Sequence, residues 1–342
     1  MLRIPYPNLY AALVRATEHL GLRGDRAQLC ARLFADTTRD GVYTHGLNRF
    51  PRFAEMIANG CIDVNAAATR VDPMAAGIAI ERWEGHLGPG NLNAHAAMSR
   101  AIELAGKHGL GGVALANTNH WMRGGSYGWQ AAEAGVFAIC WTNTLANLPA
   151  WGATTPTLGN NPLVIAVPRP DTNGRHVVLD MAMSQFSYGA LAKYSAQHAQ
   201  LPVPGGYDAA GNLTTDPAAI EASKRALAIG YWKGSGLSLV LDMLAAMLSG
   251  GLATHQIPTE PTRESGVSQI FLAIDPSSFT TRPDLARIAD GILESLREAT
   301  PVDPANPVRY PGEQTLHLRE ENLRLGVPVD PEVWAKLQAL SF

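Results

Sequence analysis

The sequence predicts a mixed α/β (α+β) protein, with helical segments at both chain ends around a central region of buried strands. Roughly the first seventy and the last forty residues carry apolar side chains at helical spacing. Between them, short apolar runs alternate with helical stretches, a pattern typical of strands that form one sheet. The glycine turn of a Rossmann fold is missing, since residues 88–93 lack its third glycine and contain a proline.

The N-terminal segment is expected to hold three helices. Gly21 ends the first and Gly60 ends the third. Asp25 is the expected N-cap of the second, because Gln28 follows it three positions later. The expected spans are 10–21, 25–33 and 49–58.

The central region is expected to alternate helices with strands. The helices are expected at residues 94–106, 125–135, 237–248 and 283–296. The strands are expected at residues 111–117, 136–143, 163–168, 177–182 and 269–274. Pro, Gly, Asp and Thr dominate residues 200–217, which predicts a loop or hairpin. We divide the chain into a helical part, residues 1–75, on which residues 305–342 pack back, and an α/β region, residues 76–304.

Composition narrows the range of functions. A formal net charge of -3 provides no basic surface for nucleic acid or anionic lipid. The 3 cysteines are an odd number without a CxxC pair, which argues against a disulfide framework and a structural zinc site. Neither a signal peptide nor an apolar run long enough to span a membrane is found, so a cytoplasmic location is expected.

The most polar segment of the N-terminal part is Tyr43–Arg49, which contains His45. On a helix, His45 and Arg49 would share one face because they are four residues apart. Such a pair suits a keto acid, since the guanidinium can hold the carboxylate while the imidazolium donates a proton to the adjacent carbonyl. Alternatively, His45 caps a helix and Arg49 is a surface charge. Spacing alone favours this second interpretation.

Three further polar segments stand at the ends of apolar ones. Residues 117–127 join a strand to a helix, and their glycines expose amides that could hold an anion or simply cap the helix. Asp180 ends a strand and needs a partner if buried, for which a histidine is one choice; alternatively Asp180 or Ser184 caps the next helix. Lys233 precedes a Gly-Ser-Gly turn that could meet a phosphate, although such turns are common in loops.

In this order, the segments resemble the malate/L-lactate dehydrogenase family, which is unrelated to the Rossmann-type dehydrogenases. The resemblance spans nearly the whole chain. It is carried by THGLNRFP, an NxxH followed by glycines, GNNPL, LDMAMS and KGSGLSLVLDML. Longer runs narrow it to members that act on a diketo sugar acid: GVYTHGLNRFPRF, NHWMRGGSYGWQAAEAG, ICWTNT, IGYWKGSG and GVSQIF.

The resemblance implies reduction of 2,3-diketo-L-gulonate to 3-dehydro-L-gulonate with NAD or NADP, NADH being slightly preferred. It implies a homodimer with a largely antiparallel, non-Rossmann cofactor-binding sheet. Apart from the resemblance, no metal is expected because the His and carboxylate residues show no ligand spacing, and charge and hydropathy favour neither a nucleic acid nor a membrane partner. Malate or lactate, ureidoglycolate and a cyclic imino acid are the alternative substrates. A non-catalytic sugar-acid binding protein is the alternative from another class.

The resemblance also implies roles for individual residues. His45 would be the proton donor. From the residues themselves we add the hypothesis that Asp180 orients His45 and keeps it cationic, and that Arg49 holds the substrate carboxylate, assisted by His120 and Arg123. The implied cofactor contacts are His176, Val177, Val178, Leu179, Asp180, Met181, Ala182, Trp232, Lys233, Gly312, Glu313 and Gln314.

Overall fold

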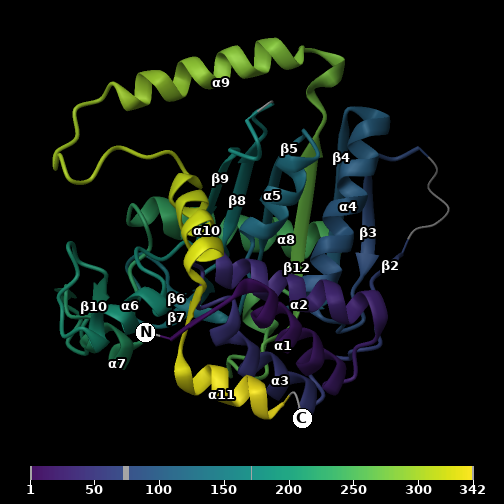
Figure 1. Cartoon of the computed structure of the whole chain (residues 1–342). Coiled ribbons are helices and arrows are strands. Elements are labelled where there is room, and N and C mark those ends of the chain that lie inside the picture. The colour runs from purple at the N-terminus through teal and green to yellow at the C-terminus, as the bar shows by residue number, and fades with distance from the viewer. Residues whose placement is uncertain (1, 72–76, 171, 341–342) are drawn as a thin grey trace.

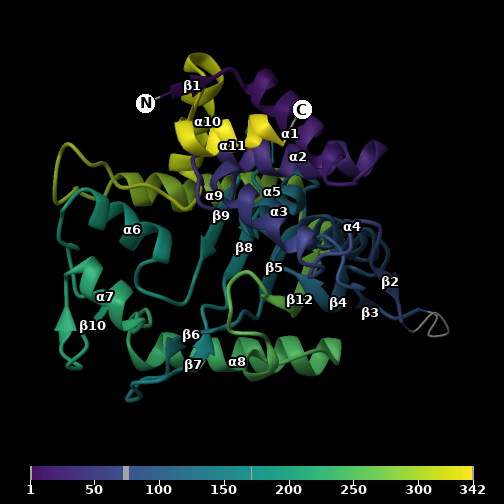
Figure 2. The ribbon, with the colours of Figure 1, turned by 90° about the horizontal axis from the view of Figure 1, so that it is seen from below.

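A seven-stranded sheet forms the centre of the protein, between helices on both faces (Figures 1 and 2). The computed structural model describes residues 2–71, 77–170 and 172–340. The helices of both chain ends lie together at one side of the sheet, and helix α8, Trp232–Ser249, covers the opposite side (Figure 2). The sheet therefore lies between α8 and the helices of the two chain ends.

The sheet is mixed and largely antiparallel. Its strand order is β2-β3-β4-β12-β5-β8-β9, and only β3 and β4 pair in parallel. The strands are β2 Thr69–Arg70, β3 Ile80–Glu84, β4 Leu110–Asn119, β12 Ser265–Ile274, β5 Phe137–Thr142, β8 Leu163–Val167 and β9 Val177–Met181. The predicted fold class is thus confirmed. Strand β9 is an edge strand, so one of its sides is left for other segments.

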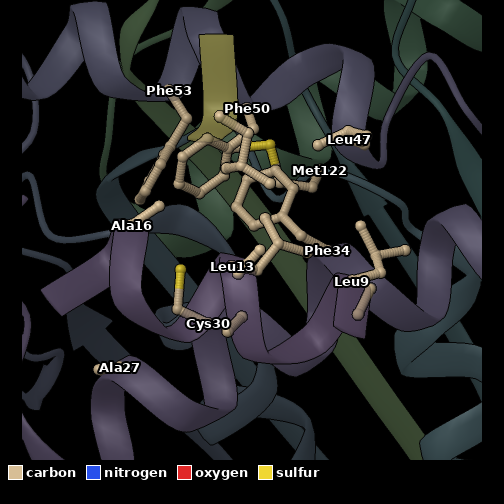
Figure 3. Packing of buried hydrophobic residues seen from close by; sticks show 14 of the residues in the cluster. Leu9, Leu13, Ala16, Ala27, Cys30, Phe34, Leu47, Phe50, Phe53 and Met122 are labelled. Carbon is tan, nitrogen blue, oxygen red and sulfur yellow. The ribbon is translucent and has the colours of Figure 1, made fainter. Parts of the chain in front are cut away.

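The two chain ends are joined by backbone pairing. Strand β1, Leu2–Ile4, pairs antiparallel with β13, Val327–Val329. Around this pair lie α1 Tyr6–His19, α2 Gly24–Arg39, η1 Leu47–Arg49, α3 Phe50–Ala58, α10 Glu313–Leu325 and α11 Pro331–Ala339. Figure 3 shows their shared core, where Phe34 and Phe50 meet edge to face with ring centroids 5.1 Å apart. The boundary expected between residues 75 and 76 lies outside the described residues, and the division into two regions remains a proposal.

The remaining elements cover the sheet or extend from it. Helices α4 and α5 pack on one face of the sheet, and α8 packs on the other. Their bounds, with those of the smaller elements, are α4 Gly90–His108, α5 Gly125–Glu133, β6 Ala146–Pro149, β7 Pro156–Gly159, α6 Tyr188–Ala196, β10 Gly206–Tyr207, β11 Leu213–Thr214, α7 Pro217–Ser223, η2 Thr254–Gln256, η3 Pro276–Ser278 and α9 Arg282–Arg297. Helix α9 runs across one end of the sheet (Figure 1) and buries only Leu293.

Two local predictions were wrong. Helix α2 begins at Gly24 and continues to Arg39, so Asp25 lies in its first turn and is not its N-cap. The helix continues past Leu33 because Phe34 and Ala35 are buried in the core shared with its neighbours, while the Thr37 and Thr38 hydroxyls donate to carbonyls of the preceding turn, at 2.6 and 2.7 Å. Strand β3 was not predicted, since its buried position holds a glutamate, Glu81.

Helix α8 presents a broad apolar face to solvent. Six of its aliphatic side chains are between 41% and 75% exposed: Leu239, Val240, Met243, Leu244, Met247 and Leu248. Isolated exposed apolar residues are ordinary, but a contiguous set marks a contact surface. In the part of the chain that the structure describes, no helix is long and apolar enough to cross a membrane.

Candidate active site

His45 lies in a turn rather than on a helix. The amides of His45 and Gly46 donate to the carbonyl of Val42, and η1 begins only afterwards. Leu47 N donates to Thr38 Oγ1 at 2.8 Å, and a Cβ on Gly46 would overlap Thr38. The expectation that His45 and Arg49 share a helix face is therefore wrong. Close packing of this turn on α2 sets their positions instead.

The imidazole rings of His45 and His120 stack on each other. Their centroids are 5.7 Å apart and their planes differ by 13°. His120 follows strand β4, and its Nδ1 accepts a hydrogen bond from Met122 N at 3.0 Å. An accepting Nδ1 leaves the proton of the neutral ring on Nε2. Met122 has φ 64°, a left-handed conformation that is costly for this residue type and is typical of functional turns.

Burial and nearby cations keep both rings neutral. Burial lowers the pKa of His45 to about 4, with Arg49 and Arg123 contributing in the same direction. Burial also places the pKa of His120 well below its usual value, and the charges of Arg49, His45 and Arg52 add to this. A bound anion would offset these cations and favour protonation. The site is therefore built to take up a proton together with a negatively charged ligand.

Arg49 faces a buried carboxylate that the sequence analysis did not find. Arg49 Nη2 lies 3.6 Å from Oε2 of Glu264, whose other oxygen accepts from Leu145 N at 3.2 Å. Burial raises the pKa of Glu264, and the Arg49 charge opposes this rise. Burial lowers the pKa of Arg49 to about 10, and Glu264 opposes that shift. Glu264 thus partly neutralises Arg49 from the side of strand β12.

Asp180 does not contact His45. Its Oδ2 accepts a hydrogen bond from Gly125 N at 2.8 Å. Burial raises the pKa of its carboxyl, against Arg123 and the Gly125 amide, but the residue as a whole is exposed, so solvent weakens this effect. Among the described residues no hydrogen bond or ion pair joins Asp180 to His45. The structure thus shows no contact through which Asp180 would orient this ring, and that role stays a prediction.

Arg123 is committed to another partner. Its side chain is 6% exposed, and Nη1 donates to Asp40 Oδ2 at 2.7 Å. This bond engages Nη1 of the guanidinium, and the expected help of Arg123 in holding the substrate carboxylate stays a prediction. Arg123 also places a positive charge near Asp180 and His45.

The segments expected to contact a cofactor meet along strand β9. Val178 N donates to the Pro311 carbonyl at 3.0 Å, which brings Gly312 and the start of α10 to this strand. At the other end, Ser184 pairs with Ala228, shortly before Trp232 and Lys233 begin α8. All three expected segments are thus connected to the same edge strand.

This edge fits an extended ligand with hydrogen-bonding groups. Ser184 Oγ is buried without a hydrogen-bond partner in the described residues. Gly312 has φ 96°, and a Cβ there would lie 3.3 Å from Trp129 Cζ2, so the backbone approaches closely. Trp232 is 64% exposed, with Lys233 Nζ 6.0 Å from its ring. A stacking ring, a cation and an unpaired hydroxyl are suited to a dinucleotide.

A separate cavity of about 560 Å³ lies at the turn of the β8–β9 hairpin. Arg169, His176 and Arg282 line it, together with acidic side chains. Of the residues expected to contact the cofactor, only His176 reaches it, and His45, Arg49 and His120 do not. This cavity is therefore separate from the stacked histidines.

Known proteins match this chain over its whole length. The family described as malate/L-lactate dehydrogenase matches residues 4–338. The 2,3-diketo-L-gulonate reductase of Shigella boydii serotype 4 (strain Sb227) is 45% identical over 339 residues, covering 99% of this chain and 100% of that protein.

Two solved structures share the fold at lower identity. Sulfolactate dehydrogenase from Methanocaldococcus jannaschii has a TM-score of 0.89 and 26% identity, covering 99% of this chain and 96% of that one. Delta1-piperideine-2-carboxylate reductase from Pseudomonas syringae pvar. tomato has a TM-score of 0.86 and 26% identity, covering 99% of this chain and 100% of that one.

Proposed function

This chain belongs to the malate/L-lactate dehydrogenase family, and from that premise we propose that it reduces 2,3-diketo-L-gulonate to 3-dehydro-L-gulonate. The resemblance read from the sequence motifs is confirmed, and the chain is an oxidoreductase that acts on CH–OH groups. The observation that carries the proposal is the pair of stacked, neutral histidines beside Arg49. The substrate assignment is supported by 45% identity to a reductase of that name over the full chain.

Arg49 is the proposed anchor for the substrate carboxylate. Its guanidinium is mostly buried, where an ionic hydrogen bond is stronger than in water. Glu264 neutralises Arg49 only partly, because the two charged groups are 3.6 Å apart. An incoming carboxylate would therefore still be attracted to the guanidinium.

His45 is the proposed proton donor. When bound, the nicotinamide cofactor supplies a hydride to C2 of the keto acid. The carbonyl oxygen then takes a proton, so that no alkoxide has to persist. Burial lowers the pKa of His45 most, and the positive charges of Arg49 and Arg123 lower it further. A bound substrate carboxylate would offset these two positive charges. Substrate binding therefore raises the pKa of His45 toward the range in which it can donate.

His120 is the proposed donor to a second substrate oxygen. Met122 N holds Nδ1 as an acceptor, which directs the Nε2 proton away from this turn. A donor with a fixed tautomer suits an oxygen beside the reacting carbonyl, as a 2,3-diketo acid provides. Asp180 and the polar edge of β9 remain the proposed place of the cofactor.

The deciding experiment measures loss of nicotinamide absorbance with 2,3-diketo-L-gulonate and either NADH or NADPH. Malate, lactate, ureidoglycolate and a cyclic imino acid form the comparison panel. The diketo acid should have the highest kcat/KM, with NADH slightly preferred. Higher kcat/KM on another acid would replace the substrate assignment while leaving the reaction class.

His45→Ala tests the proton donor directly. Turnover should fall by about a hundredfold or more, because general acid catalysis is typically worth that much. Unchanged turnover, with substrate and cofactor still bound, would remove His45 from the mechanism. A failure to bind either NADH or NADPH in a titration would instead favour the non-catalytic sugar-acid binding protein.

We also propose that the chain forms a homodimer through the exposed face of α8. The six exposed apolar side chains on that face form a contiguous patch, and such a patch on the surface of a protein typically marks a contact with another protein. Analytical ultracentrifugation should report twice the chain mass, and Met247→Glu should shift the mass toward the monomer. The cytoplasmic location remains a prediction.

A further inference from the structure

Three arginines converge on one buried carboxylate next to the active-site turn. Asp40 follows the last residue of α2, and its side chain is 2% exposed. Arg319 donates to both of its oxygens, at 2.8 and 2.7 Å, and Arg123 donates at 2.7 Å. Arg39 adds a contact of 2.9 Å. The carboxylate thus joins the N-terminal helices, the turn after β4 and the C-terminal helix α10.

The carboxyl group of Asp40 stays ionised throughout the pH range in which enzymes are assayed. Burial alone would raise the pKa of its carboxyl, but the Arg319 hydrogen bond and the charges of Arg123, Arg39 and Arg319 lower that pKa to about 2. A buried carboxylate with this many ionic partners holds them in one geometry, since any displacement leaves a buried charge unpaired. The three guanidiniums are therefore fixed relative to His45, which lies in the turn that follows.

The first arm of this cluster leads to the proton donor. Arg123 Nε is buried and has no hydrogen-bond partner within the described ranges. A point above Gly125, where a Cβ would stand, lies 3.3 Å from Arg123 Nε and 2.8 Å from Asp180 Oδ2. Arg123 thus lies between Asp40 and Asp180. Its charge also acts on His45.

The second arm leads to the edge of β9. The guanidinium carbon of Arg319 lies 5.0 Å from the centroid of the Trp129 ring. The same indole packs beneath Gly312, and its centroid is 6.1 Å from that of the His176 ring. Through Arg319, Asp40 therefore helps to hold the Trp129 side chain. This side chain packs against two of the three segments expected to contact the cofactor, those that contain His176 and Gly312.

We propose that Asp40 is a positioning residue for the reaction. It fixes Arg123 beside Asp180 and His45. It also fixes Arg319 against the ring of Trp129, which packs against the residues at the edge of β9. The proposal rests on the proposed function. Asp40 touches neither substrate nor cofactor in this account. Its two arms tune separate properties, the proton affinity of His45 and the affinity for cofactor.

Asp40→Asn is the test, with Asp36→Asn as the matched control. Asp36 lies one turn earlier on α2 and also pairs with Arg39, at 2.9 Å, but it does not contact Arg123 or Arg319. With Asp40 neutral, Arg123 is uncompensated and the pKa of His45 falls. The upper pH limit of kcat/KM should move down by about half a unit or more. The Kd for NADH, from fluorescence titration, should rise about fivefold or more.

The outcomes separate positioning from simple structural support. If Asp40→Asn lowers the thermal midpoint but matches Asp36→Asn in both pH limit and NADH Kd, the proposal is overturned. Arg319→Gln keeps Asp40 bound to Arg123, so it should weaken NADH binding without moving the pH limit. Should Asp40→Asn not fold, an unchanged NADH Kd in Arg319→Gln overturns the proposal. A wild type inactive on every acid refutes the proposed function, while the NADH titrations still test the second arm.

Discussion

The lowered pKa of His45 makes a prediction that needs no substrate. The pKa of the ring is about 4 in the folded chain, against an ordinary 6.5. Between these values the unfolded chain binds a proton that the folded chain does not, so stability falls as pH falls. From about pH 7.5 to about pH 4.5 this difference costs about 2.5 kcal/mol, since each pKa unit is worth about 1.36 kcal/mol. His45→Gln removes the titrating group and should remove this part of the pH dependence.

Urea denaturation followed by circular dichroism at those two pH values measures the effect. The wild type and His45→Gln should differ in how much stability each loses between the two, by about 2.5 kcal/mol. His255→Gln is the matched control, because it removes an exposed imidazole on η2, outside the site. Equal losses in the wild type and His45→Gln would refute the reasoning from burial and cationic neighbours.

Three further predictions concern the neighbours of the stacked rings. Arg49→Lys keeps the charge but loses the two-pronged donor, so KM for the keto acid should rise about tenfold with kcat less affected; a change in kcat alone would contradict the anchoring role. Glu264→Gln leaves Arg49 uncompensated and lowers the pKa of His45 further, so the upper limit of the kcat/KM pH profile should move to lower pH; an unmoved limit speaks against the pair. Gly312→Ala forces a side chain into φ 96° against Trp129, and thermal denaturation should show a loss of about 1–2 kcal/mol, with weaker NADH binding as the companion readout.

The sequence predicts the fold where the hydrophobic pattern is regular. Strand β8 contains only apolar residues, and β5 and β12 each contain an uninterrupted apolar run, Phe137–Trp141 and Ile270–Ile274, so these runs were sufficient to predict the strands. Strand β3 was not predicted from the hydrophobic pattern, because the residue that it buries is Glu81. That carboxylate is buried by ionic contacts with Arg100 and Arg70, whose partnership no local pattern reveals.

The same limit applies to the candidate site. His45, Arg49 and His120 belong to short contiguous motifs, and these motifs together with the family resemblance identified them. Glu264 and Asp40 matter through residues far away in the chain, and such pairings follow from the folded topology rather than from spacing. Asp180 shows the same limit, because no local pattern indicates that its carboxylate accepts a hydrogen bond from Gly125 N.

The pairing of β1 with β13 has a consequence for how the protein is made. Strand β1 and the helices that follow it are synthesised long before the strand partner of β1, Val327–Val329. Arg319 on α10, which donates two hydrogen bonds to Asp40, is also synthesised long after Asp40. A nascent chain therefore carries the turn of His45 long before the contacts that fix it exist. The geometry of that turn is therefore completed only after β13 and α10 have been synthesised.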